Sequence, residues 1–323
     1  VWCVLQRLVF IAVGAAALLA LAVGPGQVAG RVLALVAMAL SVGGISAASA
    51  QELLAWRFTP GESLNYVVQQ NMTMTMDVKG KQQTVEMNQT MDMQWKIANV
   101  DTATGDVNMA QTVERMRMTS EGGPIGSITY DSSSDADPGT PYGRALADVF
   151  RKLIRQEFGV HMRSTGKIDE VTVPESLVAS LKQSGTTGNA LDEATLKQLM
   201  TQSAITLPEK PVQQGDSWDS VQQVEMPFGT VSVKSRLTYQ GTDPGTGYAK
   251  IAMVPSITVT PKQGATVDLA LTKTEGTGTL LFDAARGRIA KSDLNLTMQM
   301  KMTSFGQVID QTIQQKTSMT LAR

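Results

Sequence analysis

The residues with the clearest chemical potential in this sequence are methionines that alternate with polar residues in three short runs. A thioether sulfur is a soft ligand of the kind that suits Cu(I), but methionine is also a flexible apolar residue that fills irregular cores. Alternation with polar residues is what a half-buried strand requires in either case. We therefore expect these side chains to pack in the core or to line an apolar ligand cavity, with a copper site as a further alternative. The candidate ligand-facing residues are Met72, Met74, Met76, Met91, Met93, Trp95, Met298, Met300 and Met302.

Other residue types that carry catalysis or bind metals are scarce. His161 is the single histidine and Cys3 the single cysteine, so the chain has neither a multi-histidine metal site nor an internal pair of thiols. No G-x-S-x-G nucleophile elbow occurs. Asp131, Asp135 and Asp137 resemble a fragment of a calcium loop that lacks its terminal bidentate glutamate, and a solvated acidic loop is the simpler interpretation. We expect a protein that is not an enzyme and has no cofactor and no metal site.

The methionines belong to segments whose alternation predicts long antiparallel strands. Between Asn71 and Trp95, two stretches with a period of two flank Lys79-Gly80, which predicts a hairpin with one apolar face. Residues 294–321 repeat this pattern near the C-terminus. A further strand is predicted over 107–118, and within it the apolar positions switch from odd to even residue numbers. A one-residue bulge near Glu114 would account for that switch.

A change of period divides the chain into parts. Within 141–210, apolar residues recur at helical spacing, whereas the regions on either side have the period of strands. We expect three helices there, over 142–157, 174–183 and 191–201. The predicted parts are an N-terminal segment (1–50), a first β unit (51–140), a helical insert with short strands (141–210) and a second β unit (211–323).

The two β regions share short motifs in the same order, which indicates a tandem duplication. Gly61-Glu62-Ser63-Leu64 matches Gly215-Asp216-Ser217-Trp218, and Gly126–Asp131 matches Gly278–Asp283. The predicted fold class is α+β and mainly antiparallel β. Its two related β units of long strands form a half-barrel or a curved sheet, with a three-helix segment between them.

The first 50 residues differ in composition from all that follows. Arg31 precedes the apolar run Val32–Ile45, which ends in Ala48-Ser49-Ala50 before polar residues begin. A positive residue, an apolar core and small residues in an A-x-A pattern are the parts of a secretory signal. We expect export to the periplasm or cell envelope, with cleavage after Ala50. The alternative is a retained membrane segment that anchors the protein.

Three motifs carry a resemblance to a protein family. They are W-x-F-x-P-G-E at Trp56–Glu62, L-P-E-K-P-V-x-x-G-D-S-W at Leu207–Trp218, and F-D-x-x-x-G-R-I within Gly276–Ile289. With these motifs the chain resembles an uncharacterised family of exported bacterial proteins of unknown function, over most of residues 52–323. The resemblance implies no catalytic residues. At the level of fold, long antiparallel strands flanked by a few helices are similar to the half-barrels of periplasmic lipoprotein carriers.

Together these features predict an exported envelope protein that binds an apolar small molecule or lipid in a methionine-lined β concavity. One alternative is a structural or interaction module that holds another envelope protein, and a further one is a methionine-rich copper-binding protein. Charge is balanced, with 28 Lys and Arg against 29 Asp and Glu, so no positive field indicates nucleic acid as a partner. Membrane contact is expected only through residues 1–50, if they are retained.

Overall fold

The prediction of a mainly antiparallel β protein with three helices is confirmed for the part of the chain that the structure describes. A computed structural model describes residues 51–323 apart from 79, 124–125, 184–192, 202–203, 227, 264–266, 305–306 and 323. The predicted signal or membrane segment, 1–50, lies outside the described residues. Within them, no helix combines the length and the apolar character needed to cross a membrane.

In chain order, the elements are β1 (Ser63–Val78), β2 (Lys81–Val100), β3 (Val107–Gly122), β4 (Ile128–Asp131), α2 (Pro141–Leu153), β5 (Phe158–Met162), β6 (Ile168–Thr172), α3 (Glu175–Gln183), α4 (Glu193–Thr201), β7 (Ser217–Met226), β8 (Gly229–Thr242), β9 (Ala249–Pro261), β10 (Val267–Asp283), β11 (Arg288–Ser304) and β12 (Gln307–Leu321). All three described helices lie between β4 and β7 in the sequence, and β5 and β6 separate the first helix from the other two.

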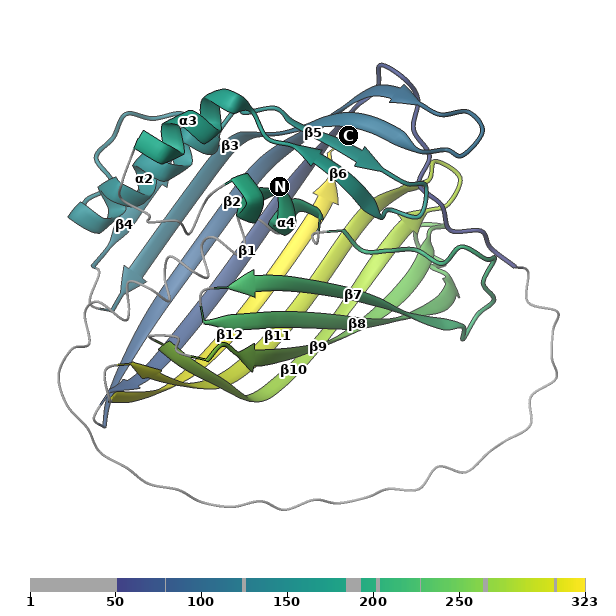
Figure 1. Ribbon diagram of the computed structural model, residues 1–323. Helices are drawn as coiled ribbons and strands as arrows, with labels where there is room; N and C mark the ends of the chain where they lie inside the picture. The colour runs from purple at the N-terminus through teal and green to yellow at the C-terminus, as the bar shows by residue number, and fades with distance from the viewer. Residues whose placement is uncertain are drawn as a thin grey trace, which may run out of the picture.

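All the described strands belong to one curved antiparallel sheet of 12 strands (Figure 1). Its order is β6-β5-β3-β2-β1-β12-β11-β10-β9-β8-β7, and β4 pairs with β3 beside this path. The pairing of β1 with β12 joins the N-terminal strands to the C-terminal ones. In Figure 1 the neighbouring long strands β3, β2, β1, β12 and β11 form one wall, and β7–β9 curl round to face it. The predicted curved sheet is therefore present and is open, because its two edge strands, β6 and β7, are not paired with each other.

The predicted hairpin forms from β1 and β2 with an uninterrupted register. Val78 pairs with Lys81 at the turn, and Ser63 pairs with Lys96 at the other end. Gly80 supplies the positive φ, +75°, that the tight turn needs. Its backbone N–H donates to Asp77 Oδ1 over 2.8 Å. The turn thus fixes which residues of the two strands lie opposite each other.

The bulge predicted near Glu114 is confirmed. Asp92 pairs with Arg115 and the next residue of β2, Met93, pairs with Val113, so Glu114 has no partner in the register. The extra residue changes the parity of β3. As a result, Met109 and Met116, which differ in parity, are both buried on one face of the sheet.

Helix α2 begins where the sequence predicts and ends earlier. Thr140 Oγ1 accepts a hydrogen bond from the Gly143 N–H at 3.0 Å, and Pro141 occupies the first turn, as expected of a helix start. The expected helix over 142–157 was too long, because α2 ends at Leu153. Beyond it, Arg155 has a φ of 59° and its N–H donates to Val113 O at the bulge of β3 over 2.9 Å. That contact turns the chain back toward β5.

The two β units follow the same order but attach their fourth strands differently. β1-β2-β3-β4 and β7-β8-β9-β10 each run as consecutive neighbours. However, β4 pairs with the end of β3, at Arg117–Ser120, whereas β10 pairs with the beginning of β9, at Ala249–Met253. The matched segments Gly126–Asp131 and Gly278–Asp283 therefore lie at opposite ends of their neighbours. The tandem duplication stays a prediction.

Candidate ligand-binding site on the concave face

The concave face of the sheet is formed by alternate residues of five neighbouring strands, β3, β2, β1, β12 and β11. On β1 the even-numbered residues from Leu64 to Met76 are buried, and the odd-numbered ones between them are half-buried or exposed. The buried positions are odd-numbered on β2 and β12 and mainly even-numbered on β11. None of these inward positions carries a charged side chain. This holds for the inward residues within 64–76, 83–97, 107–120, 292–302 and 309–321. The lining is therefore apolar or neutral throughout this part of the sheet.

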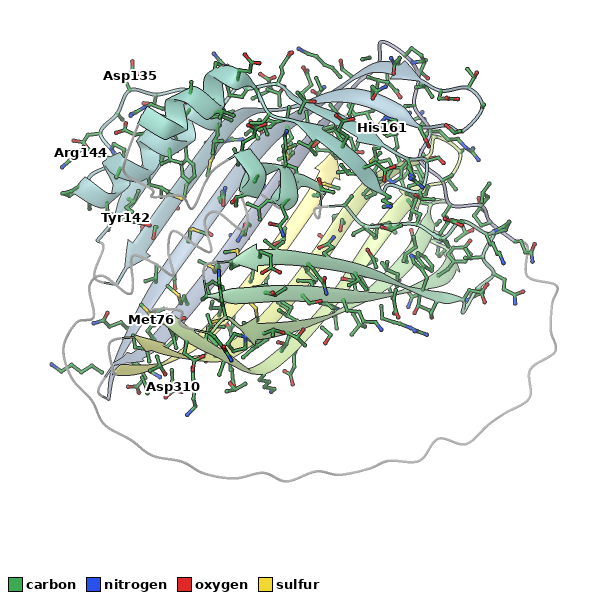
Figure 2. The ribbon with its side chains drawn as sticks, in the orientation of Figure 1. Met76, Asp135, Tyr142, Arg144, His161 and Asp310 are labelled. Carbon is green, nitrogen blue, oxygen red and sulfur yellow. The ribbon has the colours of Figure 1, made fainter. Side chains whose placement is uncertain are left out.

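The structure places all nine predicted ligand-facing residues on this face. Met300 and Trp95 are half-buried and the other seven are buried. The two methionine groups come from opposite ends of the sequence and are brought together by the β1–β12 pairing. Strand β12 lies between them, so Ile313 separates Met74 from Met298 in one row of side chains. The two groups do not form one continuous run of thioethers. Figure 2 shows Met76 near the end of β1 that leads into the turn to β2.

A polar row crosses the middle of the concave face, and we call Gln89, Gln70 and Thr317 the glutamine rung. Gln70 pairs with Gln89 on one side and with Thr317 on the other. The two glutamines are only 1% and 3% exposed. Neither amide has a hydrogen-bond partner at its oxygen or its nitrogen. Such groups are unusual in folded proteins, where about 90% or more of buried polar atoms are paired.

Aromatic residues gather at one end of the concave face, which we call the aromatic end. Trp56 stacks on Phe58 with ring centroids 5.7 Å apart and meets the edge of Phe282 at 5.9 Å. Tyr66 lies 5.0 Å from Trp95, centroid to centroid. Burial raises the pKa of the Tyr66 phenol well above its ordinary value, and its hydroxyl donates to Ile289 O over 3.2 Å. Tyr66 is thus a neutral donor within an apolar cluster.

The aromatic end encloses a cavity of about 50 Å³. The indole Nε1 atoms of Trp56 and Trp95 are buried there without a partner. A cavity of this volume has room for a few water molecules and is far smaller than the roughly 300–1,000 Å³ of ordinary ligand pockets. Its lining comes from the sheet and from the segment that covers it: Trp56, Tyr66, Met93, Trp95, Gln111, Met162, Ile168, Ala204, Ile205, Ile289 and Met319.

Residues 204–212, which we call the strap, link the two edges of the sheet. On the β6 side, the Leu207 N–H donates to Thr165 O over 2.8 Å. On the β7 side, Trp218 Nε1 donates to Thr206 O over 2.9 Å and Gln222 Nε2 to Ala204 O over 3.0 Å. Helix α4 lies in the same gap and contacts both β6 and β7. The edges are therefore joined through side chains and one short segment rather than through a ladder of strand pairs.

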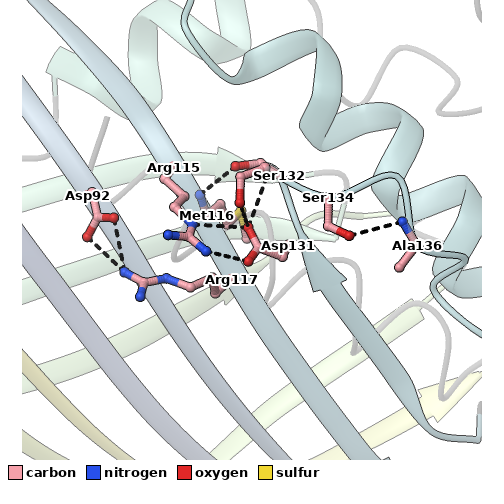
Figure 3. A network of polar contacts seen from close by, with 9 residues as sticks. Asp92, Arg115, Met116, Arg117, Asp131, Ser132, Ser134 and Ala136 are labelled. Carbon is pink, nitrogen blue, oxygen red and sulfur yellow. Dashed lines mark hydrogen bonds and ion pairs between the residues drawn. The ribbon is translucent and has the colours of Figure 1, made fainter.

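The outer face of the same strands is mainly polar, and several of its charged side chains form ion pairs (Figure 3). Arg117 donates to both carboxylate oxygens of Asp92 at 3.0 Å. Arg115 donates to Asp131 over 3.1 and 2.5 Å, and this arginine, together with the Ser133 N–H, holds the pKa of Asp131 well below its usual range. These groups stabilise the surface and do not converge on a ligand site.

The acidic loop and the histidine both lie outside the concave face. Asp137 is paired with Arg144, while Asp135 is exposed on the same loop (Figure 2). Among the described residues, no group of three His, Cys, Asp or Glu side chains could hold a metal ion. His161 lies on β5 with its Nδ1 2.9 Å from Asn108 Oδ1. That contact places it on the outer side of the strand, away from Val160 and Met162.

The glutamine rung and the strap were not predicted from the period of the apolar residues. Gln70 and Gln89 have the parity of the buried methionines beside them, and the turn at Lys79-Gly80 sets them opposite each other. That register was a usable signal for the rung. The strap coincides with the motif L-P-E-K-P at Leu207–Pro211, but no local pattern indicates that this segment bridges two edges of a sheet.

The fold and this face define a class of protein: a mainly antiparallel β protein whose single curved sheet encloses a neutral, largely apolar face. A model described as a family of unknown function (DUF6263) matches residues 104–289. The match covers more than half of the chain, and the chain belongs to this family. A model of the disulfide bond formation protein DsbB matches residues 1–110. The described part of that span, 51–110, holds β1, β2 and the start of β3, and the chain has one cysteine, whereas a disulfide needs two.

Solved structures with a similar outline have low sequence identity. A structure titled for lipid–protein interactions in lipovitellin is 11% identical with a TM-score of 0.46, covering 83% of this chain. The match spans 26% of that chain, so the present chain corresponds to about a quarter of it. An outer membrane channel from Pseudomonas putida F1 is 6% identical with a TM-score of 0.26, covering 83% of this chain and 97% of that one. These scores lie below 0.5 and carry no functional inference. No curated protein matches the sequence.

Proposed function

We propose that this chain is a non-catalytic binding protein that holds an apolar ligand, such as a lipid, against the concave face of its sheet. The observation that supports the proposal is the absence of charge from the inward positions of β3, β2, β1, β12 and β11, while the outward positions of the same strands are mainly polar and include charged residues such as Asp92, Arg117 and Lys301. An apolar chain gains about 0.8 kcal/mol for each CH₂ group that it buries against such a face. The abundant methionines can adapt their shape to it.

Ligand entry must enlarge the enclosed space, because the cavity of about 50 Å³ is too small for a lipid chain. The strap is the natural place for that opening. It spans a gap in which β6 and β7 share no strand pairing. Among the described residues, hydrogen bonds with Thr165 on one side and with Trp218, Ser220 and Gln222 on the other hold it in place. We propose that the strap and α4 move away from one edge and that the ligand enters between β6 and β7.

We infer the compartment from the sequence of the first 50 residues. Arg31, the apolar run Val32–Ile45 and Ala48-Ser49-Ala50 have the order of a secretory signal. We propose that the protein is exported and acts in the periplasm or cell envelope, where lipids are the abundant apolar molecules. A chain that works there without disulfides depends on the large core of its sheet.

The test uses the full chain, exported from a bacterial host and recovered without detergent. Organic extraction and mass spectrometry of the purified protein should detect a lipid at a constant ratio to protein. After delipidation, the protein should enhance the fluorescence of the neutral probe N-phenyl-1-naphthylamine, and the extracted lipid should displace the probe.

A matched pair of variants locates the binding. Met300→Lys places a charge at a half-buried inward position, and Gln299→Lys places it at the neighbouring exposed outward position. Met300→Lys should weaken probe binding at least about tenfold, because a charge is costly in an apolar site, while Gln299→Lys leaves it unchanged. A protein that carries no lipid and does not bind the probe would rule out the proposed function, as would equal effects of the two substitutions in folded variants.

A further inference from the structure

The glutamine rung is the most unusual feature of the concave face. Gln70 and Gln89 lie directly opposite each other on paired strands and are almost completely buried. Their amides do not bond to each other, so two oxygens and two nitrogens remain without partners. The next glutamine along β12, Gln315, shares this property in part: its Nε2 donates to Thr317 Oγ1 over 2.8 Å, and its Oε1 has no partner.

The neighbours of the rung on β2 and β3 are apolar, while on β12 Thr317 lies beside Gln70 and accepts a hydrogen bond from Gln315 Nε2. Gln89 lies opposite Met118 on β3, and the rows above and below it hold Met91 with Val68 and Met87 with Met72. A buried donor or acceptor left unpaired costs about 1–3 kcal/mol. Leucine at these positions would avoid that cost and would suit the apolar face. The presence of two opposed glutamines therefore indicates a bound group that pairs with them.

The chemistry of the rung restricts what that group can be. Each amide offers two N–H donors and one carbonyl acceptor, so the best partner has both an acceptor and a donor. A charged group is a poor partner, because no inward position of the neighbouring strands carries a compensating charge and an unpaired buried charge is strongly unfavourable. Amides and alcohols meet both conditions. A carboxylate does not, and an ester offers acceptors only.

We infer that the glutamine rung selects a lipid by an uncharged group that both donates and accepts hydrogen bonds, an amide or an alcohol on an apolar chain. This inference rests on the proposed function, since the chain of such a ligand would lie along the methionines of the concave face. The rung lies between the aromatic end and the methionine-rich end of β1, so the ligand has apolar surface to contact on both sides of its polar group. The rung is then a specificity determinant and the rest of the face supplies affinity.

The test compares 12-carbon ligands that differ only in their polar group, measured by displacement of N-phenyl-1-naphthylamine from the delipidated full-length protein. Dodecanamide and 1-dodecanol should bind about tenfold more tightly than methyl dodecanoate, because one additional hydrogen bond to a buried partner contributes on that scale. Dodecane and, at pH 8, dodecanoate should bind more weakly than the amide. Methyl dodecanoate matches the amide in carbonyl and chain but lacks its donor.

The double variant Gln70→Leu/Gln89→Leu separates selectivity from binding. It should still bind the fluorescent probe, bind the amide, alcohol and ester within about twofold of one another, and melt at a higher temperature in the ligand-free state, since the unpaired amides are gone. Gln69→Leu is the control, because Gln69 is next to Gln70 in β1 and is exposed on the outer face of the sheet. It should leave both the selectivity and the melting temperature unchanged.

The outcomes distinguish this inference from the proposed function. If the wild-type protein binds the probe but ranks the ligands as the double variant does, the rung holds only water or nothing, and the inference is wrong while the proposed function stands. If the double variant melts at a lower temperature than the wild type and keeps the ligand order, the glutamines are structural and the inference is also wrong. If no form of the protein binds the probe or any of the ligands, the proposed function itself fails.

Discussion

The two faces of the same strands treat polar groups in opposite ways. On the outer face the side chains are mainly polar, and charged residues of β2 and β3 form ion pairs, as Arg117 does with Asp92 at 3.0 Å. On the concave face, charge is absent from the neighbouring rows, and the amides of Gln70 and Gln89 at its centre are neutral and have no hydrogen-bond partner. Charge on the outer face is explained by solubility. Solubility cannot explain amides that are almost completely buried, which is why we assign a binding role to the inner face alone.

The strongest test of this comparison introduces the same charge on each face at adjacent positions. Met74 is 2% exposed on the concave face, while Thr75 is half-buried on the outer face. Met74→Lys should lower the free energy of unfolding by more than about 3 kcal/mol, because an unpaired ammonium is buried. Thr75→Lys should change it by less than about 0.5 kcal/mol. Urea denaturation of both variants measures the difference.

Similar losses in the two lysine variants would contradict the comparison, because they would mean that both faces are covered. Similar tolerance would mean that the face described as concave and buried is open to water in solution. Either result would also remove the basis for placing an apolar ligand there.

A second test concerns the contact between the sheet and the segments that cover its aromatic end. Gly166 has a φ of +88°, and a Cβ there would lie 2.7 Å from Trp56 Nε1 and 2.8 Å from Ile205 O. Gly247 has a φ of +74° in a turn where a Cβ would meet nothing within 4 Å. Both alanine variants share the backbone strain of about 1–2 kcal/mol. Gly166→Ala should lose at least about 1 kcal/mol more, because the strap and Trp56 must shift.

Thermal melting of Gly166→Ala and Gly247→Ala measures this difference, and the fluorescence of the tryptophans reports on the shift. Equal melting temperatures would show that the strap does not lie against the sheet in solution. In that case the aromatic end would be permanently open, and no movement of the strap would be needed for ligand entry.

Much of the sheet could be predicted from local alternation, because each strand has to present one face to water and the other to the interior. That rule identified the hairpin of β1 and β2, and a switch of parity located the bulge at Glu114. The rung was within reach of the same reasoning. Once Lys79-Gly80 is taken as the turn, Gln70 falls opposite Gln89 on the methionine face, and two opposed buried amides demand an explanation.

The rest depends on contacts between residues that lie far apart in the sequence. Nothing local to β1 or β12 indicates that they pair, although this pairing joins the two β units and brings both methionine groups to one face. The strap is similar. Thr206 and Leu207 form hydrogen bonds to opposite edges of the sheet through their backbone groups, which every residue has, so the sequence gives no sign of these contacts. The end of α2 at Leu153 depends on the bulged strand that Arg155 contacts, and its own sequence carries only the weak signal of Arg151 and Lys152 in the last turn.

The smallest expected effect concerns the outer face at low pH. The Arg115 guanidinium and the Ser133 N–H hold the pKa of Asp131 below its usual range, so the folded protein binds a proton there less readily than the unfolded chain does. This contribution to stability is present in full above about pH 4 and is lost as the pH falls toward the folded-state pKa. Because both partners are partly exposed, its size should be less than about 1 kcal/mol.

Asp131→Asn should therefore unfold more readily than the wild type at pH 6, and the difference should shrink between pH 4 and pH 2. The neighbouring Asp135→Asn, on the same exposed loop, is the control and should follow the wild type. A difference for Asp131→Asn that stays constant down to pH 2 would show that the ion pair is absent in solution. The inner face should show no counterpart to this titration, because the glutamines and threonine of its centre have no proton to gain or lose over that range. A pH dependence of ligand selectivity at the rung would thus have to come from the ligand.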